Sequence, residues 1–476
     1  MTALFFVVPA RAVWLLLLVA SCAFYMAFIP VYVLILLFTI LVDYTAGLLI
    51  ERSTGPRRKT WLVASIVTNV GVLAVFKYYN FFVHSLEDAA HGLGMSATLP
   101  ALTWILPIGL SFHTFQAMSY TLEVYRGNQK AEHHLGIYAL YVMFYPQLVA
   151  GPIERPQNLL PQFRAFQLSP RWNDANVVYG LRLMLWGLFK KCVVADRLSP
   201  VVDRVYGQPE AFGSVAHALA TVFFAFQIYA DFSGYSDIAL GAARVMNIKL
   251  MTNFRQPYLA VSVSDFWRRW HVSLSTWFKD YVYVPLGGSR HGMARTNLNL
   301  LLTFMVSGLW HGANWTFVVW GALNGMLLVL ENGLRRAASR WSALTWLVAE
   351  SGVWAQVARV RTFALVCCTW VFFRAETVQD GFFILGSVVA HAPDLFSVHA
   401  IREALVSVQM SRHDVALIFA LVGCTMLYDI IAERSDPVMS VEGLPRWARW
   451  CAYYAVAGAV TFLGVFGGQQ FIYFQF

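Results

Sequence analysis

Long apolar runs separated by short polar segments form the main pattern of this chain. A helix needs about 20 apolar residues to cross the hydrocarbon core of a bilayer. The runs lie at Ala12–Pro30, Val31–Ile50, Trp61–Val83, Ala101–Leu122, Leu135–Ala150, Val177–Val194, Val215–Ala230, Leu298–Leu330, Thr362–Phe373 with an upstream extension, Gly381–Ala390, Val415–Ile431 and Trp450–Phe466. Several are short, so we expect some re-entrant or interfacial helices. The pattern predicts an all-α polytopic membrane protein with about ten to twelve transmembrane helices.

Charges in the first loops orient these predicted helices. The loop after the second run is basic and therefore cytoplasmic by the positive-inside rule, with Arg52, Arg57, Arg58 and Lys59. The next loop, His84–Pro100, carries acidic residues but no lysine or arginine, which predicts an external position. The stretch Arg244–Arg295 is rich in arginine and lysine, so we place it mostly at the cytoplasmic face.

Composition supports a membrane protein and excludes several other classes. Of the 476 residues, 58% are hydrophobic and 13% are charged, about half the charged share of a soluble protein. The net charge of +9 resides largely in short loops between apolar runs, so nucleic acid is not an expected partner. No basic residue precedes Arg11 and an apolar span follows, which argues against a cleavable signal peptide. No linker separates a soluble domain, so we expect one membrane domain over residues 1–476.

Cysteine usage and enzyme motifs narrow the chemistry. The six cysteines are scattered singly apart from Cys367 and Cys368, and none forms a C-x-x-C pair. This pattern argues against a disulfide framework or a zinc site, and we expect no metal. The chain has no G-x-S-x-G elbow, H-E-x-x-H, Walker loop or G-x-G-x-x-G. The candidates for functional residues are therefore polar residues within apolar segments, where such residues are costly and mark function.

His311 lies inside the longest apolar run. A helix over Leu298–Leu330 would be roughly 50 Å long, too long for a core of about 30 Å. It must kink, tilt or break, and a break costs least near Ser307, Gly308 and Gly312. Backbone freed by a break must face protein or a water-filled cavity. His311 is therefore a candidate for lining a buried polar cavity, with a core histidine bonded to a backbone carbonyl as an equal alternative.

His271 lies in a segment with helical periodicity. The spacing predicts a helix over Asp265–Tyr281 whose aromatic face includes Trp270 and His271. Arginines and other polar residues occupy the opposite face, which is typical of an amphipathic helix at a membrane interface. The alternative for His271 is a neighbour of interfacial tryptophans that bonds locally.

Other polar residues near these segments offer weaker signals. The sequence Pro285–Arg290 predicts a turn after that helix, and Lys279 and Arg290 near it are candidates for binding an anionic cofactor. A lone Gly-Gly is a weak phosphate signal, so a solvated loop is the favoured reading. Asp231, Asp237 and Glu123 are acids in apolar surroundings, and we expect them to orient a histidine or to pair with an arginine such as Arg244.

The segment Phe266–Trp277 resembles a signature of the membrane-bound O-acyltransferase superfamily, in particular the bacterial branch of alginate O-acetyltransferase and the D-alanyl transferase of teichoic acid. The segment Trp310–Phe317 resembles the second signature. Further similar blocks follow in order along most of the chain: Leu106–Phe112, Tyr145–Ile153, Tyr229–Asp237, Trp370–Arg374 and Phe471–Phe476. There are two departures. We expect an N-terminal helix that is usual in the family to be truncated here, and His113 stands where a tyrosine is common.

The resemblance implies acyl transfer to a hydroxyl in a membrane protein built around a central funnel. It assigns His311 as the catalytic histidine and His271 as the second signature histidine. Histidine, with a pKa near 6.5, suits the removal of a proton from a hydroxyl at neutral pH. Supporting or cavity residues would be Trp270, Asp231, Ser307, Trp310 and Asn314. No cofactor is expected to stay bound.

The same resemblance implies the reaction partners. The donor would be a thioester, most simply acetyl-CoA from the cytoplasm, and the acceptor an external exopolysaccharide or cell-wall polymer. The protein would lie among the lipids of the bacterial inner membrane. Because the chain has no soluble hydrolase-like domain, we expect a separate extracytoplasmic acetyltransferase partner. The rival function is a proton-coupled transporter or channel, since broken helices and buried histidines also mark transporters.

The last residues, Phe471–Phe476, are almost wholly apolar and aromatic. Burying each ring is worth about 2 kcal/mol, so this tail should dock in protein or lipid. An aromatic anchor at the bilayer interface is the favoured reading. The sharper hypothesis makes Tyr473 an acyl relay, because a phenol is more easily deprotonated than a sugar hydroxyl.

Overall fold

The computed structural model describes the chain except residues 1, 96–97, 167–171, 350, 468–470 and 473–476. It is 79% helical, and the described residues contain no strand. Six of their helical segments are long and apolar enough to cross a membrane: Pro30–Arg52, Pro56–Gly92, Ser214–Val245, Trp315–Arg340, Gly352–Arg374 and Arg412–Ala432. Two shorter apolar helices accompany them. The all-α polytopic membrane fold is thus confirmed, whereas the number of crossings stays a prediction.

The chain divides into two compact units. The first comprises residues 1–184 and 238–251, and the second comprises residues 185–237 and 252–476. Two helices, α10 (Asp174–Leu188) and α12 (Ser214–Val245), run across these boundaries in the sequence. The expectation of one domain over residues 1–476 stays a prediction.

The first unit is a helical bundle with an apolar core that contains a small polar cluster. Its other helices are α1 (Thr2–Val7), α2 (Val13–Met26), α3 (Val33–Arg52), α4 (Pro56–Leu73), α5 (Tyr79–Gly92), α6 (Leu110–Arg126), α7 (Leu135–Met143), α8 (Tyr145–Leu148) and α9 (Pro156–Ala165). Where α3, α4 and α6 pack together, buried Asp43 accepts hydrogen bonds from Ser65 and Asn69 at 2.5 and 2.9 Å. These bonds satisfy a carboxyl group that lipid could not.

One predicted span in this unit is wrong in its first part. Residues 101–107 are not helical, and α6 begins only at Leu110. Pro107 restricts the residue before it, and Gly109 has a φ of 75°, which favours glycine. Hydrophobicity alone therefore overestimated the length of this helix.

The second unit contains the remaining elements. They are the π-helical turn η4 (Phe189–Ala195), α11 (Asp196–Gly207), α13 (Val263–Arg269), α14 (Val272–Phe278), α15 (Gly292–His311), α16 (Trp315–Arg340), α17 (Gly352–Arg374), α18 (Val378–Ala390), α19 (Val398–Ser407), α20 (Arg412–Ala432), α21 (Pro437–Ser440) and α22 (Arg446–Leu463). Short 3-10 or π turns connect several of them. One large apolar core in this unit joins residues of η4, α12, α13 and α17.

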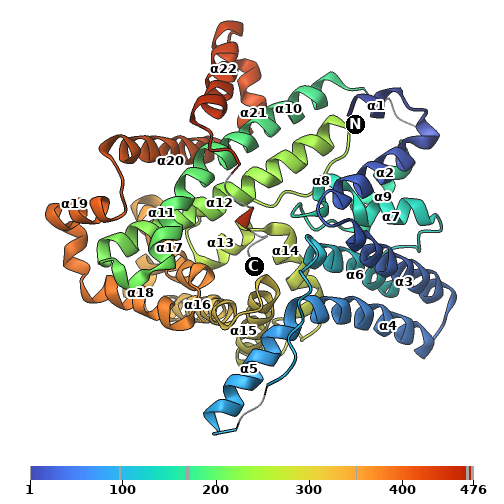
Figure 1. Cartoon of the computed structure of the whole chain (residues 1–476), viewed down its shortest axis with the longest axis horizontal. Coiled ribbons are helices and arrows are strands. Elements are labelled where there is room, and N and C mark those ends of the chain that lie inside the picture. The colour runs from blue at the N-terminus through green and yellow to red at the C-terminus, as the bar shows by residue number, and fades with distance from the viewer. Residues whose placement is uncertain (1, 96–97, 167–171, 350, 468–470, 473–476) are drawn as a thin grey trace. The chain divides into compact units, whose positions relative to one another are not determined.

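The long apolar run around His311 forms a helical hairpin. α15 and α16 lie side by side in Figure 1, and residues 312–314 join them. The predicted break is confirmed, but it falls at Gly312, whereas Ser307 and Gly308 stay helical. Gly308 instead permits close packing, because a Cβ there would overlap the Phe317 carbonyl, and Gly321 faces Phe304 in the same way.

Candidate functional site

His311 is the last residue of α15, directly before the hairpin turn. Its side chain is buried. Asn314 fixes the other side of the turn as the N-cap of α16, because its side chain accepts a hydrogen bond from the Thr316 backbone at 3.0 Å. Asn314 also donates to the Glu376 carbonyl at 3.1 Å. The break thus places a histidine at a helix end whose geometry is fixed from two sides.

His271 lies between two helices, so the continuous helix predicted over Asp265–Tyr281 is wrong. α13 ends at Arg269, α14 begins at Val272, and His271 has φ 41° and ψ 55°. Periodicity continued through the break because the residues on both sides still share an apolar face. A left-handed backbone is uncommon for histidine and is found mostly where the surroundings enforce it, often at functional sites. Here the Val272 backbone donates to the Asn253 carbonyl at 2.9 Å.

The environment of His271 is apolar, as the sequence pattern predicted. The side chain is 1% exposed, and the Phe232 ring meets it edge-on at 4.7 Å between centroids. Burial lowers the pKa of His271 to about 3. The imidazole is therefore neutral at physiological pH and keeps one nitrogen lone pair and one N–H group.

The structure brings the two histidines together. Their ring centroids lie 6.4 Å apart, and Trp310 contacts both, at 6.3 Å from His271 and 4.9 Å from His311. The rings are inclined by 56°. This separation places two neutral or singly protonated nitrogen bases around one small volume, which suits two groups acting on one reacting centre.

Aromatic rings surround this pair. Trp270 contacts Trp370 at 5.0 Å, and Trp370 stacks on Trp320 at 5.9 Å. Trp320 and Phe373 in turn lie 5.1 and 5.2 Å from the His311 ring. Such a setting excludes water, which strengthens electrostatic interactions at the histidines. Trp320 was not predicted; its position one turn beyond the start of α16 carries no motif.

The remaining predicted supporting residues take different places. Ser307 is buried one helical turn before His311 on α15. Lys279 and Arg290 are exposed, and Arg290 donates to the backbone carbonyls of Val284 and Gly287. The predicted turn over residues 285–290 is present, but its role in binding a donor stays a prediction.

Of the three predicted acids, Asp231 and Asp237 pair with lysines, whereas Glu123 pairs with an arginine as expected, although not with Arg244. Asp231 lies 2.8 Å from Lys191, and Asp237 lies 2.7 Å from Lys190. Both lysines belong to η4, which lies mostly within the apolar run Val177–Val194. Glu123, in the other unit, pairs with Arg126 at 3.3 Å. A sequence contains no direct sign of such pairings, because η4 and α12 meet only in the fold.

The C-terminal tail approaches the site through its described residues. Tyr473 lies outside the described residues, as do the three residues after it. Phe471 and Ile472 are buried. The Phe471 ring lies 6.1 Å from Phe232, the residue that contacts His271. Phe471 and Ile472 thus dock in protein.

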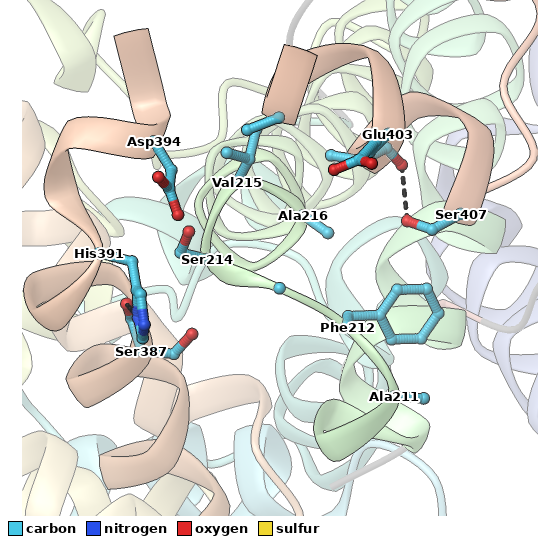
Figure 2. Close-up of a pocket in the computed structure, with 13 residues that line it drawn as sticks. Ala211, Phe212, Ser214, Val215, Ala216, Ser387, His391, Asp394, Glu403 and Ser407 are labelled. Carbon is cyan, nitrogen blue, oxygen red and sulfur yellow. Dashed lines mark hydrogen bonds between the residues drawn. The ribbon is translucent and has the colours of Figure 1, made fainter. Parts of the chain in front are cut away.

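A separate cavity of about 420 Å³ lies elsewhere in the second unit. Figure 2 shows polar side chains around the start of α12, among them Ser214, His391, Asp394 and Glu403. None of the predicted site residues lines it. The histidine pair and this cavity are therefore distinct features.

Two buried histidines surrounded by aromatic rings form the candidate site of this membrane protein. Residues 126–374, just over half of the chain, match the family model described as MBOAT, membrane-bound O-acyltransferase family. The chain belongs to this family, and it is a multi-pass membrane O-acyltransferase. This decides against the transporter alternative.

Individual relatives refine the comparison. The chain is 39% identical over 374 residues to the Probable alginate O-acetylase AlgI of Pseudomonas aeruginosa, covering 77% of this chain and 67% of the relative. It is 33% identical over 407 residues to the Peptidoglycan O-acetyltransferase of Helicobacter pylori, covering 79% and 73%. Identity to the Teichoic acid D-alanyltransferase of Bacillus subtilis is 26% over 277 residues, covering 56% and 69%. These relatives support a membrane O-acetyltransferase.

Proposed function

We propose that this protein takes an acetyl group from a cytoplasmic thioester, most simply acetyl-CoA, and delivers it for O-acetylation of an exopolysaccharide or cell-wall polymer. The observation that carries the proposal is the buried pair of His271 and His311, with ring centroids 6.4 Å apart. A thioester and a hydroxyl bound between them would share one water-excluded volume.

His311 acts as the general base. Its imidazole removes the proton from the attacking hydroxyl as the oxygen bonds to the thioester carbonyl carbon. The C–S bond then breaks, and the thiolate leaves and takes up the proton from His311. His271, neutral in its apolar surroundings, donates a hydrogen bond to the carbonyl oxygen and orients the acyl group. A positioned base contributes about 10² to 10⁴ in rate.

Charge at the helix ends supports a cytoplasmic donor. The last turns of α16 carry Arg335, Arg336 and Arg340, at the end of the helix far from His311. Arg269 and Arg359 cluster around Glu433 at 3.3 and 3.5 Å. Basic helix ends of this kind face the cytoplasm, where acyl thioesters are made. Lys279 and Arg290 belong to the basic stretch Arg244–Arg295 and are our candidates for holding an anionic donor. The protein itself would lie in the inner membrane of a bacterium.

The acceptor side involves the tail and a partner. We propose that Tyr473 carries the acetyl group as a phenyl ester, formed by the same attack on the thioester. The docked residues Phe471 and Ile472 support this route, because they bring the chain next to Phe232 and His271. A separate extracytoplasmic acetyltransferase would then move the acetyl group to the polymer. Peptide mapping by mass spectrometry after donor addition should find one acetyl group on Tyr473, and Tyr473→Phe should prevent it.

The overall function is tested with purified protein in liposomes. Labelled acetyl-CoA should be cleaved only when the protein is present, and the label should appear on protein or acceptor. In cells, deletion of the protein should remove O-acetyl groups from one surface polymer and leave its backbone length unchanged. Intact thioester together with an unaltered acetyl content of every surface polymer would contradict the proposal.

A further inference from the structure

The segment that follows α22 is tied to η4 by a backbone hydrogen bond. After α22, the Val465 N–H donates to the Cys192 carbonyl at 2.9 Å. That carbonyl is available because η4 is a π-helical turn. The Asp196 N–H, which would bond Cys192 in an α-helix, bonds the Lys191 carbonyl instead. The register shift thus creates an acceptor for the C-terminal segment.

A second contact ties the same segment to the start of α11. The Arg197 guanidinium donates to the Leu463 carbonyl, the last residue of α22, at 2.5 Å. A cation at the C-terminal end of a helix is favourable, because the free carbonyls there carry partial negative charge. Two neighbouring stretches of chain, η4 and the start of α11, therefore set the direction in which the tail leaves α22.

The third contact lies closest to the histidines. The Ile472 N–H donates to one carboxylate oxygen of Asp231 at 2.7 Å, and Lys191 lies 2.8 Å from the other oxygen. Lys191 also bonds Asp196 at 2.8 Å. Asp231 and Ile472 are 3% and 2% exposed. Lys191 places a positive charge beside the same carboxylate, and a charge-assisted hydrogen bond in such a buried place is strong.

The residue after Asp231 connects this contact to the site. On α12, Phe232 lies 6.1 Å from Phe471 and 4.7 Å from His271, centroid to centroid. Tyr235, one turn further, packs on Phe471 at 5.0 Å. The tail and His271 thus contact the same ring, and a shift of the tail would reach the histidine through one side chain.

We infer that Asp231 and Lys191 are positioning residues that hold the C-terminal segment beside His271 in the geometry needed for acyl transfer. This inference rests on the proposed function. We call Lys191, Asp231 and the Ile472 backbone the C-terminal latch. The latch gives the buried carboxylate of Asp231 on α12 two partners, the Lys191 ammonium and the Ile472 backbone. It also assigns Phe471 and Ile472 to the site rather than to the bilayer interface.

The test measures amide hydrogen exchange in the C-terminal peptide of the full-length protein in nanodiscs. In Asp231→Ala, exchange of the Ile472 amide should accelerate by about tenfold or more, the loss expected for a bond to a charged group. Asp231→Asn keeps an oxygen acceptor but loses the charge, so the Ile472 exchange rate in this variant should lie between those of the wild type and Asp231→Ala. Asp237→Asn is the matched control: the same substitution on α12, at a carboxylate paired with Lys190 instead, should leave tail exchange unchanged.

Activity is measured on the same variants, with donor cleavage and acetyl transfer recorded separately. Asp231→Ala and Lys191→Met should lower kcat for transfer by about tenfold or more, the loss expected for this bond, and leave KM for the donor within about twofold. Asp231→Asn should recover part of the transfer rate. Unchanged Ile472 exchange in folded Asp231→Ala, or faster exchange with full transfer, would overturn the inference. Failure of the proposed function would give a different result: a His311 variant would still transfer the acetyl group, while the expected changes in Ile472 exchange would still be observed.

Discussion

The imidazole rings of His271 and His311 lie 6.4 Å apart, although the two residues come from different helical breaks. One break is the turn of the α15–α16 hairpin, and the other is a single left-handed residue between α13 and α14. His311 ends α15 directly before one break, His271 lies within the other, and the two rings meet at the same place. The site is therefore a product of two interruptions rather than of two intact helices.

The left-handed backbone of His271 separates its structural role from its chemical role. Asparagine adopts this conformation with little cost, whereas alanine is strained there by about 1 kcal/mol or more. His271→Asn should therefore fold like the wild type but lose acyl transfer by about tenfold to a hundredfold, because a hydrogen-bonding group is misplaced. His271→Ala should lose both activity and stability. Thermal unfolding and transfer rates of the two variants, measured together, check this; full activity in His271→Asn would remove the residue from the reaction.

Close packing in the hairpin should be sensitive at Gly308. A Cβ there would overlap the Phe317 carbonyl, so Gly308→Ala should destabilise the protein by about 1–3 kcal/mol and displace His311. Gly333→Ala is the matched control on α16, since nothing lies within 4 Å of its Cβ position. That control should be neutral or slightly stabilising, because alanine favours helix. The unfolding midpoints of the two variants are measured in the same detergent. Equal midpoints for both variants would refute close packing as the reason for Gly308.

Asn314 should matter through the helix end that it caps. Asn314→Ala removes the hydrogen bond to the Thr316 backbone and should cost about 1 kcal/mol. Asn314→Asp or Asn314→Ser keeps an accepting oxygen and should restore stability. Since the cap fixes the turn after His311, Asn314→Ala should also lower transfer several-fold. A stable Asn314→Ala protein with normal transfer would show that the cap is dispensable.

Glu154, in the first unit, should make stability depend on pH. The side chain is fully buried, and burial raises its pKa from 4.5 to about 7 despite hydrogen bonds from Asn158 and the Met251 backbone. Because the folded pKa is above the unfolded one, the stabilisation is fully present below about 4.5 and is lost as pH rises through about 7. The loss is at most ~3 kcal/mol. Glu154→Gln should flatten the unfolding midpoint between pH 5 and pH 8, and an equal slope in both proteins would contradict the assignment.

Much of the fold was predictable because its cause is local. Apolar runs mark helices, and the run around His311 had to break because it exceeded the bilayer thickness. The break at His271 was not predictable from periodicity, since Trp270 and Leu274 keep one apolar face on both sides of it. The predicted helix over residues 101–107 was wrong for a related reason: hydrophobicity does not show that Pro107 and Gly109 delay the start of the helix to Leu110.

The candidate site divides in the same way. His271, His311 and the tryptophan beside each could be selected from the sequence because they fall in the two segments that resemble family signatures. The lysine partners of Asp231 and Asp237 could not, because a salt bridge between η4 and α12 depends on how distant segments pack. Trp320 and Phe232 joined the site only through their positions on α16 and α12.

The central claim is that His311 removes the proton in acyl transfer, and single-turnover transfer from labelled acetyl-CoA tests it most directly. His311→Ala, checked for folding by its unfolding midpoint, should lower the transfer rate by about 10² to 10⁴ and still bind the donor. His399→Ala, which changes an exposed histidine on α19, should keep the wild-type rate. Wild-type transfer by a folded His311→Ala protein would contradict the account.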